Sequence, residues 1–172
     1  MADQSHLRPR PARGGMVLRV LQSWWAPRRV VRGLAGMTDA TLLAVLMLAM
    51  VLTLLAQAPF HARAAQLDPS IPLDARLGGA AMGAMFMMPL LAYALAGLVA
   101  ILSRTTPWRL DARSSRIALF WALLAVAPAM LLAGLVAGLI GPGPALVLTR
   151  SVAGLGFLFI WGAGIAALAR RI

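Results

Sequence analysis

The chain has 172 residues, of which 61% are apolar and only 12% are charged, and its formal net charge is +11. Soluble domains average about 45–50% apolar and about 25% charged residues, so this composition argues against a soluble fold and against disorder over most of the chain. The 16 basic residues, all Arg, lie between apolar runs. Membrane topology and anionic lipid explain this charge better than nucleic acid does, so we expect no nucleic-acid partner. Cysteine is absent, which excludes disulfides and thiolate metal sites.

The first 36 residues divide into a tail and a membrane-surface segment. Residues 1–15 are basic and rich in Pro and Gly, which predicts disorder. In residues 16–36 the apolar side chains fall on one helical arc and the arginines on the other, and Pro27 separates two short helical pieces. We expect this segment to lie on the membrane surface; the alternative is a soluble helix that packs on a partner. The residues expected to contact the membrane are Arg19, Trp24, Trp25, Arg28, Arg29 and Arg32.

Four apolar runs follow in residues 37–172, which form one transmembrane domain. The predicted spans are residues 40–58, 78–102, 117–140 and 145–169, each near the roughly 20 residues that cross a bilayer. Pro89 and Pro128 should kink the second and third spans. The predicted fold class is all-α: a polytopic integral membrane protein with a four-helix transmembrane bundle and an N-terminal amphipathic interfacial helix.

The start of the chain also allows a competing interpretation as a cleaved signal peptide. Ala56-Gln57-Ala58 resembles a cleavage site, and Arg28-Arg29 precedes the first span. The first apolar run is longer than the usual 7–15 residues of such a signal, and Pro59 follows the site directly. These two features favour an uncleaved anchor.

The distribution of arginine predicts the orientation of the spans. Seven Arg precede the first span, four lie in loop 103–116 and two close the chain. Loop 59–77 balances two Arg with two Asp, and the turn at 141–144 has no charge. Because basic loops stay in the cytoplasm, we expect both termini to be cytoplasmic.

The spans carry no recognisable catalytic or metal-binding group. None has an Asp, Glu, His or Lys near its centre, where catalytic and transporting membrane proteins usually keep one. Asp39 and Arg150 lie at span ends and fit a helix cap and an interfacial anchor. His61 lacks a second ligand at a suitable spacing, and Asp68 and Asp74 fit a charge-balanced loop. We therefore expect no enzymatic activity, no cofactor and no metal.

Small residues and methionines mark the spans as well. Gly134 and Gly138 in the third span, and Gly154 and Gly162 in the fourth, are expected to let helices approach closely. Packing within the bundle is the first expectation for these glycines, and an oligomer interface is the second. The second span also holds a methionine cluster: Met82, Met85, Met87 and Met88. The thioether groups of methionine can bind Cu(I), but they more often fill gaps in apolar packing.

Three segments carry a resemblance to a known family: VLRVLQSWWAPRRVVRGL, DPSIPLDARL and ARSSRIALFWALLAVAPAMLLAGLVAGLIGPGPAL. Through them, residues 16–168 resemble the Yip family (Ypt/Rab-interacting proteins) of multi-span membrane proteins, in its bacterial branch. The resemblance implies a helical bundle with a cytosolic N-terminus and, in eukaryotic members, binding of Rab-type GTPases. For bacterial members it implies an integral membrane protein without an assigned role and without transferable site residues.

The expected function is non-enzymatic. We expect a scaffold or accessory protein of the cell inner membrane that binds membrane-protein partners, another copy of itself, or anionic lipid through its cytoplasmic face. A small transporter or channel is the alternative, which the two prolines and the methionine cluster suggest and the missing intramembrane charge opposes. Loop 103–116 would extend the basic cytoplasmic face with Arg104, Arg109, Arg113 and Arg116.

Overall fold

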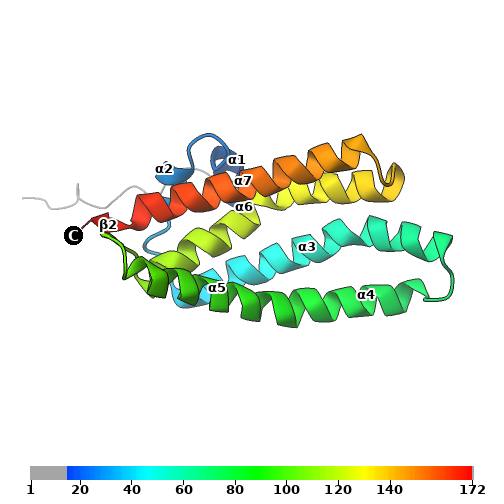
Figure 1. Ribbon diagram of the computed structural model, residues 1–172, viewed down its shortest axis with the longest axis horizontal. Coiled ribbons are helices and arrows are strands. Elements are labelled where there is room, and N and C mark those ends of the chain that lie inside the picture. The colour runs from blue at the N-terminus through cyan, green and yellow to red at the C-terminus, as the bar shows by residue number, and fades with distance from the viewer. Residues whose placement is uncertain (1–14, 172) are drawn as a thin grey trace, which may run out of the picture.

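The computed structural model describes residues 15–171 and is almost entirely helical (Figure 1). The tail predicted over residues 1–15 lies, except for Gly15, outside the described residues. The helical elements in chain order are α1 (Met16–Gln22), α2 (Pro27–Arg32), α3 (Asp39–Leu67), α4 (Leu73–Met82), the π-helix η2 (Gly83–Met87), α5 (Met88–Ser103), α6 (Ala112–Leu139) and α7 (Pro144–Leu168).

Four helical stretches of the described chain are long and apolar enough to cross a membrane, as the sequence predicted. These stretches are Asp39–Leu67, Leu73–Ser103, Ala112–Leu139 and Pro144–Leu168. Two-residue strands β1 (Trp108–Arg109) and β2 (Arg170–Arg171) pair antiparallel beside the last span. The fold class is therefore that of a four-span helical membrane protein.

Helix α6 is the centre of the bundle. It packs along α3 on one side and α7 on the other, and it also contacts α5. It is the most buried of the four spans, and Phe120 and Trp121 in its first half are almost completely enclosed. The hydrophobic core therefore follows α6.

The two ends of the bundle carry different loops (Figure 1). Residues 33–38, loop 104–111 and β2 lie together at one end, which we call the terminal end. Loops 68–72 and 140–143 lie at the opposite end, which we call the distal end.

The first span is longer than predicted, because α3 continues through Pro59 to Leu67. The expected loop 59–77 is thereby reduced to residues 68–72. A proline inside a helix removes one backbone hydrogen bond and usually kinks or ends the helix. Here α6 supports the helix, since a Cβ atom on Gly138 would lie only 2.4 Å from Cβ of Pro59. Tertiary packing therefore overrides the local helix-ending signal.

The second span also begins earlier than predicted, at Leu73, and it accommodates Pro89 through a π-helical turn. In this turn the backbone N–H of Met88 bonds to the carbonyl of Gly83, five residues back. The wider turn gives the proline ring room against the preceding carbonyls. The expected kink thus takes the form of a π-bulge.

The third span begins at Ala112, five residues before the predicted start at 117, because Asp111 caps it. The Asp111 carboxylate accepts the backbone N–H of Ser114 at 3.1 Å, which satisfies one of the unpaired donors at the helix start. Hydrogen bonds from the side chain and backbone of Ser114 hold the pKa of Asp111 below its usual value, although partial burial opposes the shift.

Candidate functional site

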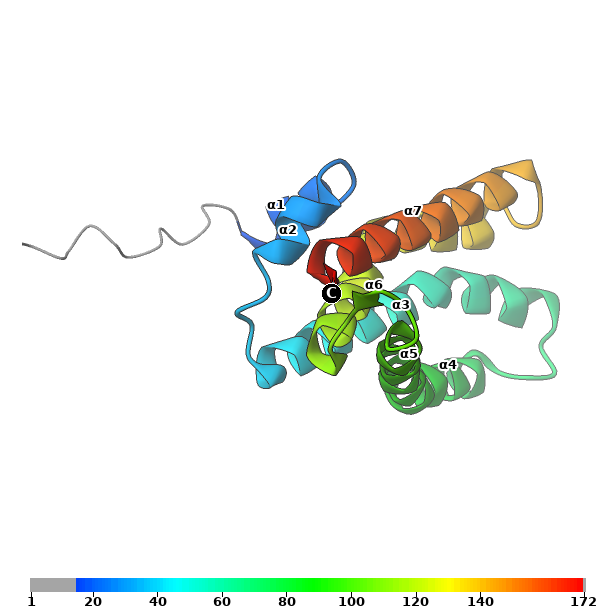
Figure 2. The ribbon, with the colours of Figure 1, turned by 60° about the vertical axis from the view of Figure 1, so that its left-hand side comes forward.

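Helices α1 and α2 form a short hairpin that docks on α6 and α7 (Figure 2). Pro27 begins α2, as the sequence predicted. The apolar side of α2 is turned to the bundle, where Val31 of α2 and Leu34, just after the helix, are 0% and 1% exposed. The predicted amphipathic segment therefore packs on the protein itself with part of its apolar surface.

Hydrogen bonds hold the turn of the hairpin against α6. Trp24 donates its indole N–H to the carbonyl of Ala125 at 3.1 Å. Trp121 donates its indole N–H to the hydroxyl of Ser23 at 2.8 Å, and this buried hydroxyl donates to the carbonyl of Arg19 at 2.8 Å. Burying these polar groups without partners would cost free energy, so the bonds specify where the hairpin docks.

Trp24 reaches far along the spans. A Cβ atom on Gly156 would lie 2.6 Å from the Trp24 ring, and Gly156 is the middle residue of α7. Ala125 lies near the middle of α6, in the turn that precedes Pro128. Trp24 was expected on the membrane surface. In the structure its ring is partly buried and packs against α6 and α7, and its contact with the membrane surface stays a prediction.

A second apolar face of α1 remains exposed. Val17 and Trp25 are 74% and 69% exposed, and Leu18 and Leu21 are exposed as well. Val17 and Leu21 are four residues apart and lie on one side of α1, and Trp25 follows in the turn after the helix. Such a face on a chain with membrane spans suits contact with lipid. Part of the predicted apolar arc therefore packs on the bundle, and the rest is exposed on the outside of the protein.

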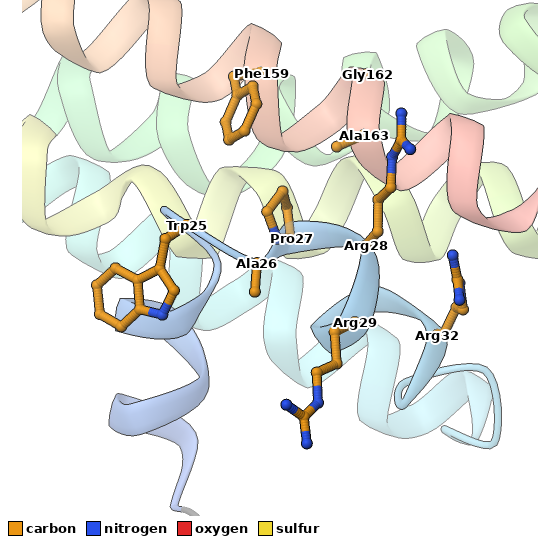
Figure 3. Close-up of a pocket in the computed structure, with 9 residues that line it drawn as sticks. All are labelled: Trp25, Ala26, Pro27, Arg28, Arg29, Arg32, Phe159, Gly162 and Ala163. Atoms are coloured by element: carbon orange, nitrogen blue, oxygen red, sulfur yellow. The ribbon is translucent and has the colours of Figure 1, made fainter.

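A cleft of about 730 Å³ opens between the hairpin and α7 (Figure 3). In Figure 3 the side chains of Arg28 and Arg32 extend toward α7, whereas Arg29 points away from it. The wall of the cleft on α7 is apolar. The lining residues are Trp25, Ala26, Pro27, Arg28, Arg29 and Arg32 from the hairpin and Phe159, Gly162 and Ala163 from α7.

The three arginines of the cleft have no anionic partner within residues 15–171. The ion pairs in this part of the chain join Arg76 to Asp68 and Arg116 to Asp39, both away from the cleft. Guanidinium groups form their strongest hydrogen bonds with carboxylates and phosphates. The cleft therefore suits a ligand that combines an anionic group with an apolar body. Arg19, the remaining predicted arginine, is half-exposed on α1.

The arginines before and within the third span divide into two groups. Arg113 donates to the carbonyl of Met37, and Arg116 lies 3.6 Å from the Asp39 carboxylate. These contacts tie the start of α6 to the start of α3. Arg104 and Arg109 stay exposed at the terminal end. Only part of the predicted basic loop is thus available to a ligand.

The glycines of the third span lie against α3. A Cβ atom on Gly134 would come within 1.8 Å of the carbonyl oxygen of Ala56, and one on Gly138 would meet Pro59. No larger residue fits without moving a helix backbone. These two glycines therefore set the distance between α3 and α6.

The glycines of the fourth span behave differently. A Cβ atom on Gly154 or Gly162 would meet no described atom within 4 Å, so neither packs within the bundle. The close approaches on α7 are at Gly156, beside Trp24, and Gly164, whose added Cβ would lie 3.2 Å from Cβ of Ala118. Both glycine pairs repeat every eight residues, so spacing alone could not choose between them. Gly156 and Gly164 are the pair that packs, because the hairpin and α6 lie on their side of α7.

A smaller cavity of about 240 Å³, lined mostly by apolar residues, lies at the distal end between α3, α6 and α7. Gln57, His61 and Arg150 line it, and Nε2 of His61 is buried without a hydrogen-bond partner among the described residues. Arg63 lies nearby and donates to the carbonyl of Gly138 at 3.3 Å. Sequence reasoning missed this cavity because it ended the first helix before His61.

Apolar cavities of about 280 and 140 Å³ lie further along the spans. Met50 and Met88 line both cavities, and Met130 lines the larger one and the distal cavity. Of the predicted methionine cluster, Met85 packs on the core, whereas Met82, Met87 and Met88 are exposed. Over residues 15–171, no three His, Cys, Asp or Glu side chains gather as a metal site would require.

No protein-family model, curated protein or solved structure matches this chain. The fold and the site therefore define a class: a multi-pass helical membrane protein with an arginine-bearing hairpin docked on its spans.

Proposed function

We propose that this chain is a non-enzymatic accessory or scaffold protein that gathers anionic lipid at the terminal end of its bundle. The observation that carries the proposal is the group Arg28, Arg29 and Arg32, which has no partner in the described chain and lies beside the exposed Trp25. A basic residue near an anionic membrane surface contributes about 1 kcal/mol of attraction. The three arginines of the docked hairpin contribute about 3 kcal/mol together on the same scale.

Two features of the sequence support the biological setting of this proposal. The excess of arginine at the terminal end favours a cytoplasmic position for it. The resemblance of residues 16–168 to the bacterial branch of the Yip family favours an inner-membrane protein that works through binding. In this setting the arginines face the leaflet surface where anionic lipids meet the cytoplasm.

The test compares lipid selection by the full-length protein and a variant carrying Arg28→Gln, Arg29→Gln and Arg32→Gln. Each protein is reconstituted into phosphatidylcholine bilayers that contain a minor fraction of phosphatidylglycerol, and the lipids retained after gentle extraction are counted. We expect the wild type to enrich phosphatidylglycerol and the triple variant to lose the enrichment, because the attraction of about 3 kcal/mol is gone.

A distal variant, Arg76→Gln with Arg150→Gln, serves as the control for a general loss of charge. It should enrich phosphatidylglycerol as the wild type does, because both residues lie at the other end of the bundle. Equal enrichment by the wild type and the triple variant would reject the proposed role of the hairpin.

The accessory role predicts a partner in the native membrane as well. Gentle purification of the tagged protein from its own membranes should yield a reproducible, stoichiometric membrane-protein partner. A lone monomer or homo-oligomer would leave lipid organisation as the remaining form of the proposal.

A small transporter or channel is the second candidate, and the cavities along the spans favour it. The distal cavity, with Gln57, His61 and Arg150, shares Met130 with the larger apolar cavity. Toward the terminal end, the side chains of Phe120 and Trp121 are almost completely enclosed. Vesicles reconstituted with the protein should then release entrapped solutes faster than empty vesicles, and equal rates would remove this candidate.

A further inference from the structure

We propose that the cleft between α2 and α7 holds one phospholipid molecule, with its phosphate at Arg28 and Arg32 and its apolar part against Phe159 and Gly162. The inference rests on the proposed function, since it names the ligand and the place of lipid binding. It goes further by requiring a single, saturable site in place of a diffuse basic surface.

The depth of the cleft is the first argument. Gly162 and Phe159 lie six and nine residues before the end of α7 at Leu168, which is about 9 and about 14 Å along the helix axis. Half of the hydrocarbon core of a bilayer is about 15 Å thick. The α7 wall of the cleft thus belongs to the part of the helix that crosses the lipid.

The charge of the cleft is the second argument. An arginine beside the membrane-crossing part of a helix is costly unless an anion or water accompanies it. Arg28 and Arg32 extend toward this part of α7 (Figure 3), and the described chain offers them no carboxylate. A phosphate group would satisfy the planar donor fork of each guanidinium group.

The apolar wall selects the source of the phosphate. Phe159, Gly162 and Ala163 present no charged or hydrogen-bonding side chain to an occupant. A soluble anion would leave this wall without a partner, whereas a phospholipid places its glycerol and acyl carbons against it. The volume of about 730 Å³ lies in the range of pockets that enclose drug-sized ligands, about 300–1,000 Å³.

The space in front of Gly162 permits a specific test. A Cβ atom at this position would meet nothing within 4 Å, so Gly162→Phe places a ring in the cleft without displacing a neighbour at its Cβ. This variant fills the cleft and keeps every arginine. The complementary variant, Arg28→Gln with Arg32→Gln, keeps the shape of the cleft and removes the charge.

The experiment titrates the full-length protein, purified in mild detergent, with phosphatidylglycerol and counts bound lipids by native mass spectrometry. The wild type should bind one molecule saturably. Gly162→Phe should lose that bound molecule, and Arg28→Gln with Arg32→Gln should bind it at least tenfold more weakly. Each variant must keep the wild-type melting temperature, and the arginine variant tests the proposal even if the phenylalanine disturbs the helix.

Matched controls separate the cleft from general effects. Gly97→Phe adds the same ring at an open position on α5, and Arg104→Gln with Arg109→Gln removes two charges from the same end of the bundle. Both controls should bind one phosphatidylglycerol as the wild type does. Inorganic phosphate serves as the probe for a soluble anion and should not compete at concentrations that match the lipid.

Each contrary outcome has a defined meaning. Undiminished single-lipid binding by Gly162→Phe and by the arginine variant overturns the inference, and so does competition by inorganic phosphate. If bilayers show enrichment of anionic lipid without a saturable bound molecule, the inference fails and the proposed function stands. If the wild type shows neither effect, the proposed function fails as well.

Discussion

At the start of α6, the position of the span depends on the side chain of Asp111. Ser114 donates hydrogen bonds to this carboxylate and lowers its pKa. The sequence showed an aspartate three residues before a serine, but the predicted span began only at 117, where the uncharged run starts. Apolar composition identifies the part of a helix that lies in lipid and does not identify its capped extension.

Replacing Asp111 by Ala should lower the free energy of unfolding by about 1 kcal/mol at neutral pH, because the cap is lost. The folded-state pKa lies below the reference value of 3.8, so the stabilisation by the charged cap is present above pH 3.8. It is lost as the pH falls through the lowered pKa. Thermal unfolding in detergent should therefore show a difference from wild type at neutral pH that shrinks in acid.

Asp74→Ala is the matched control, since Asp74 lies in the first turn of α4 and is exposed. It should change the melting temperature much less than Asp111→Ala. A difference between Asp111→Ala and wild type that grows as the pH falls would contradict the assignment.

Arg63 and His61 show what sequence reasoning could not find at the residue scale. Arg63 lies beside Gly141, where a Cβ atom would come within 2.7 Å of its guanidinium carbon. Gly141 has φ +92°, a conformation that favours glycine. The contact of Arg63 with Gly141 and the place of His61 in the distal cavity both depend on the continuation of α3 through Pro59. The sequence did not predict this continuation, which packing against α6 makes favourable.

At the scale of elements, docking of the hairpin distinguishes this molecule from a bundle with a surface helix. Over residues 27–34 the helical wheel correctly separated the buried Val30, Val31 and Leu34 from the exposed arginines. It could not tell whether lipid or protein covers the apolar side, because both are apolar. The contacts of Trp24 with Ala125 on α6 and Gly156 on α7 show that protein covers part of this side.

Gly156→Ala should loosen the hairpin, because the added Cβ would lie 2.6 Å from the Trp24 ring. Overpacking of this kind typically costs about 1–3 kcal/mol. Hydrogen exchange in residues 16–36 should become faster, while exchange in the centre of α6 should change little.

Gly154→Ala is the control for this change on the same helix, since nothing lies within 4 Å of its added Cβ. Exchange in residues 16–36 should then equal that of the wild type. Equal exchange in both variants would show that Trp24 does not rest on Gly156.

At the scale of the whole molecule, the arginine distribution predicts the orientation in the membrane. The chain has no cysteine, so a single introduced cysteine would be its only labelled thiol and would report on which side of the membrane its loop lies. Thr105→Cys lies in the loop at the terminal end and Ser70→Cys in the loop at the distal end.

A membrane-impermeant maleimide applied to intact cells should label Ser70→Cys and spare Thr105→Cys. Permeabilised cells should label both, which controls for accessibility. The reverse pattern in intact cells would invert the proposed orientation and place the arginine cleft on the outer side.

The sequence alone determined the class of protein and the number of spans. These properties depend on composition and local apolar runs, which are visible within about 20 residues. Only the tertiary structure decided where the hairpin docks, which glycines touch a neighbour and how the cleft is formed. Trp24 and its acceptor Ala125 are 101 residues apart, and the cleft combines α2 with α7. Such contacts depend on how helices pack, and no local pattern in the chain records that packing.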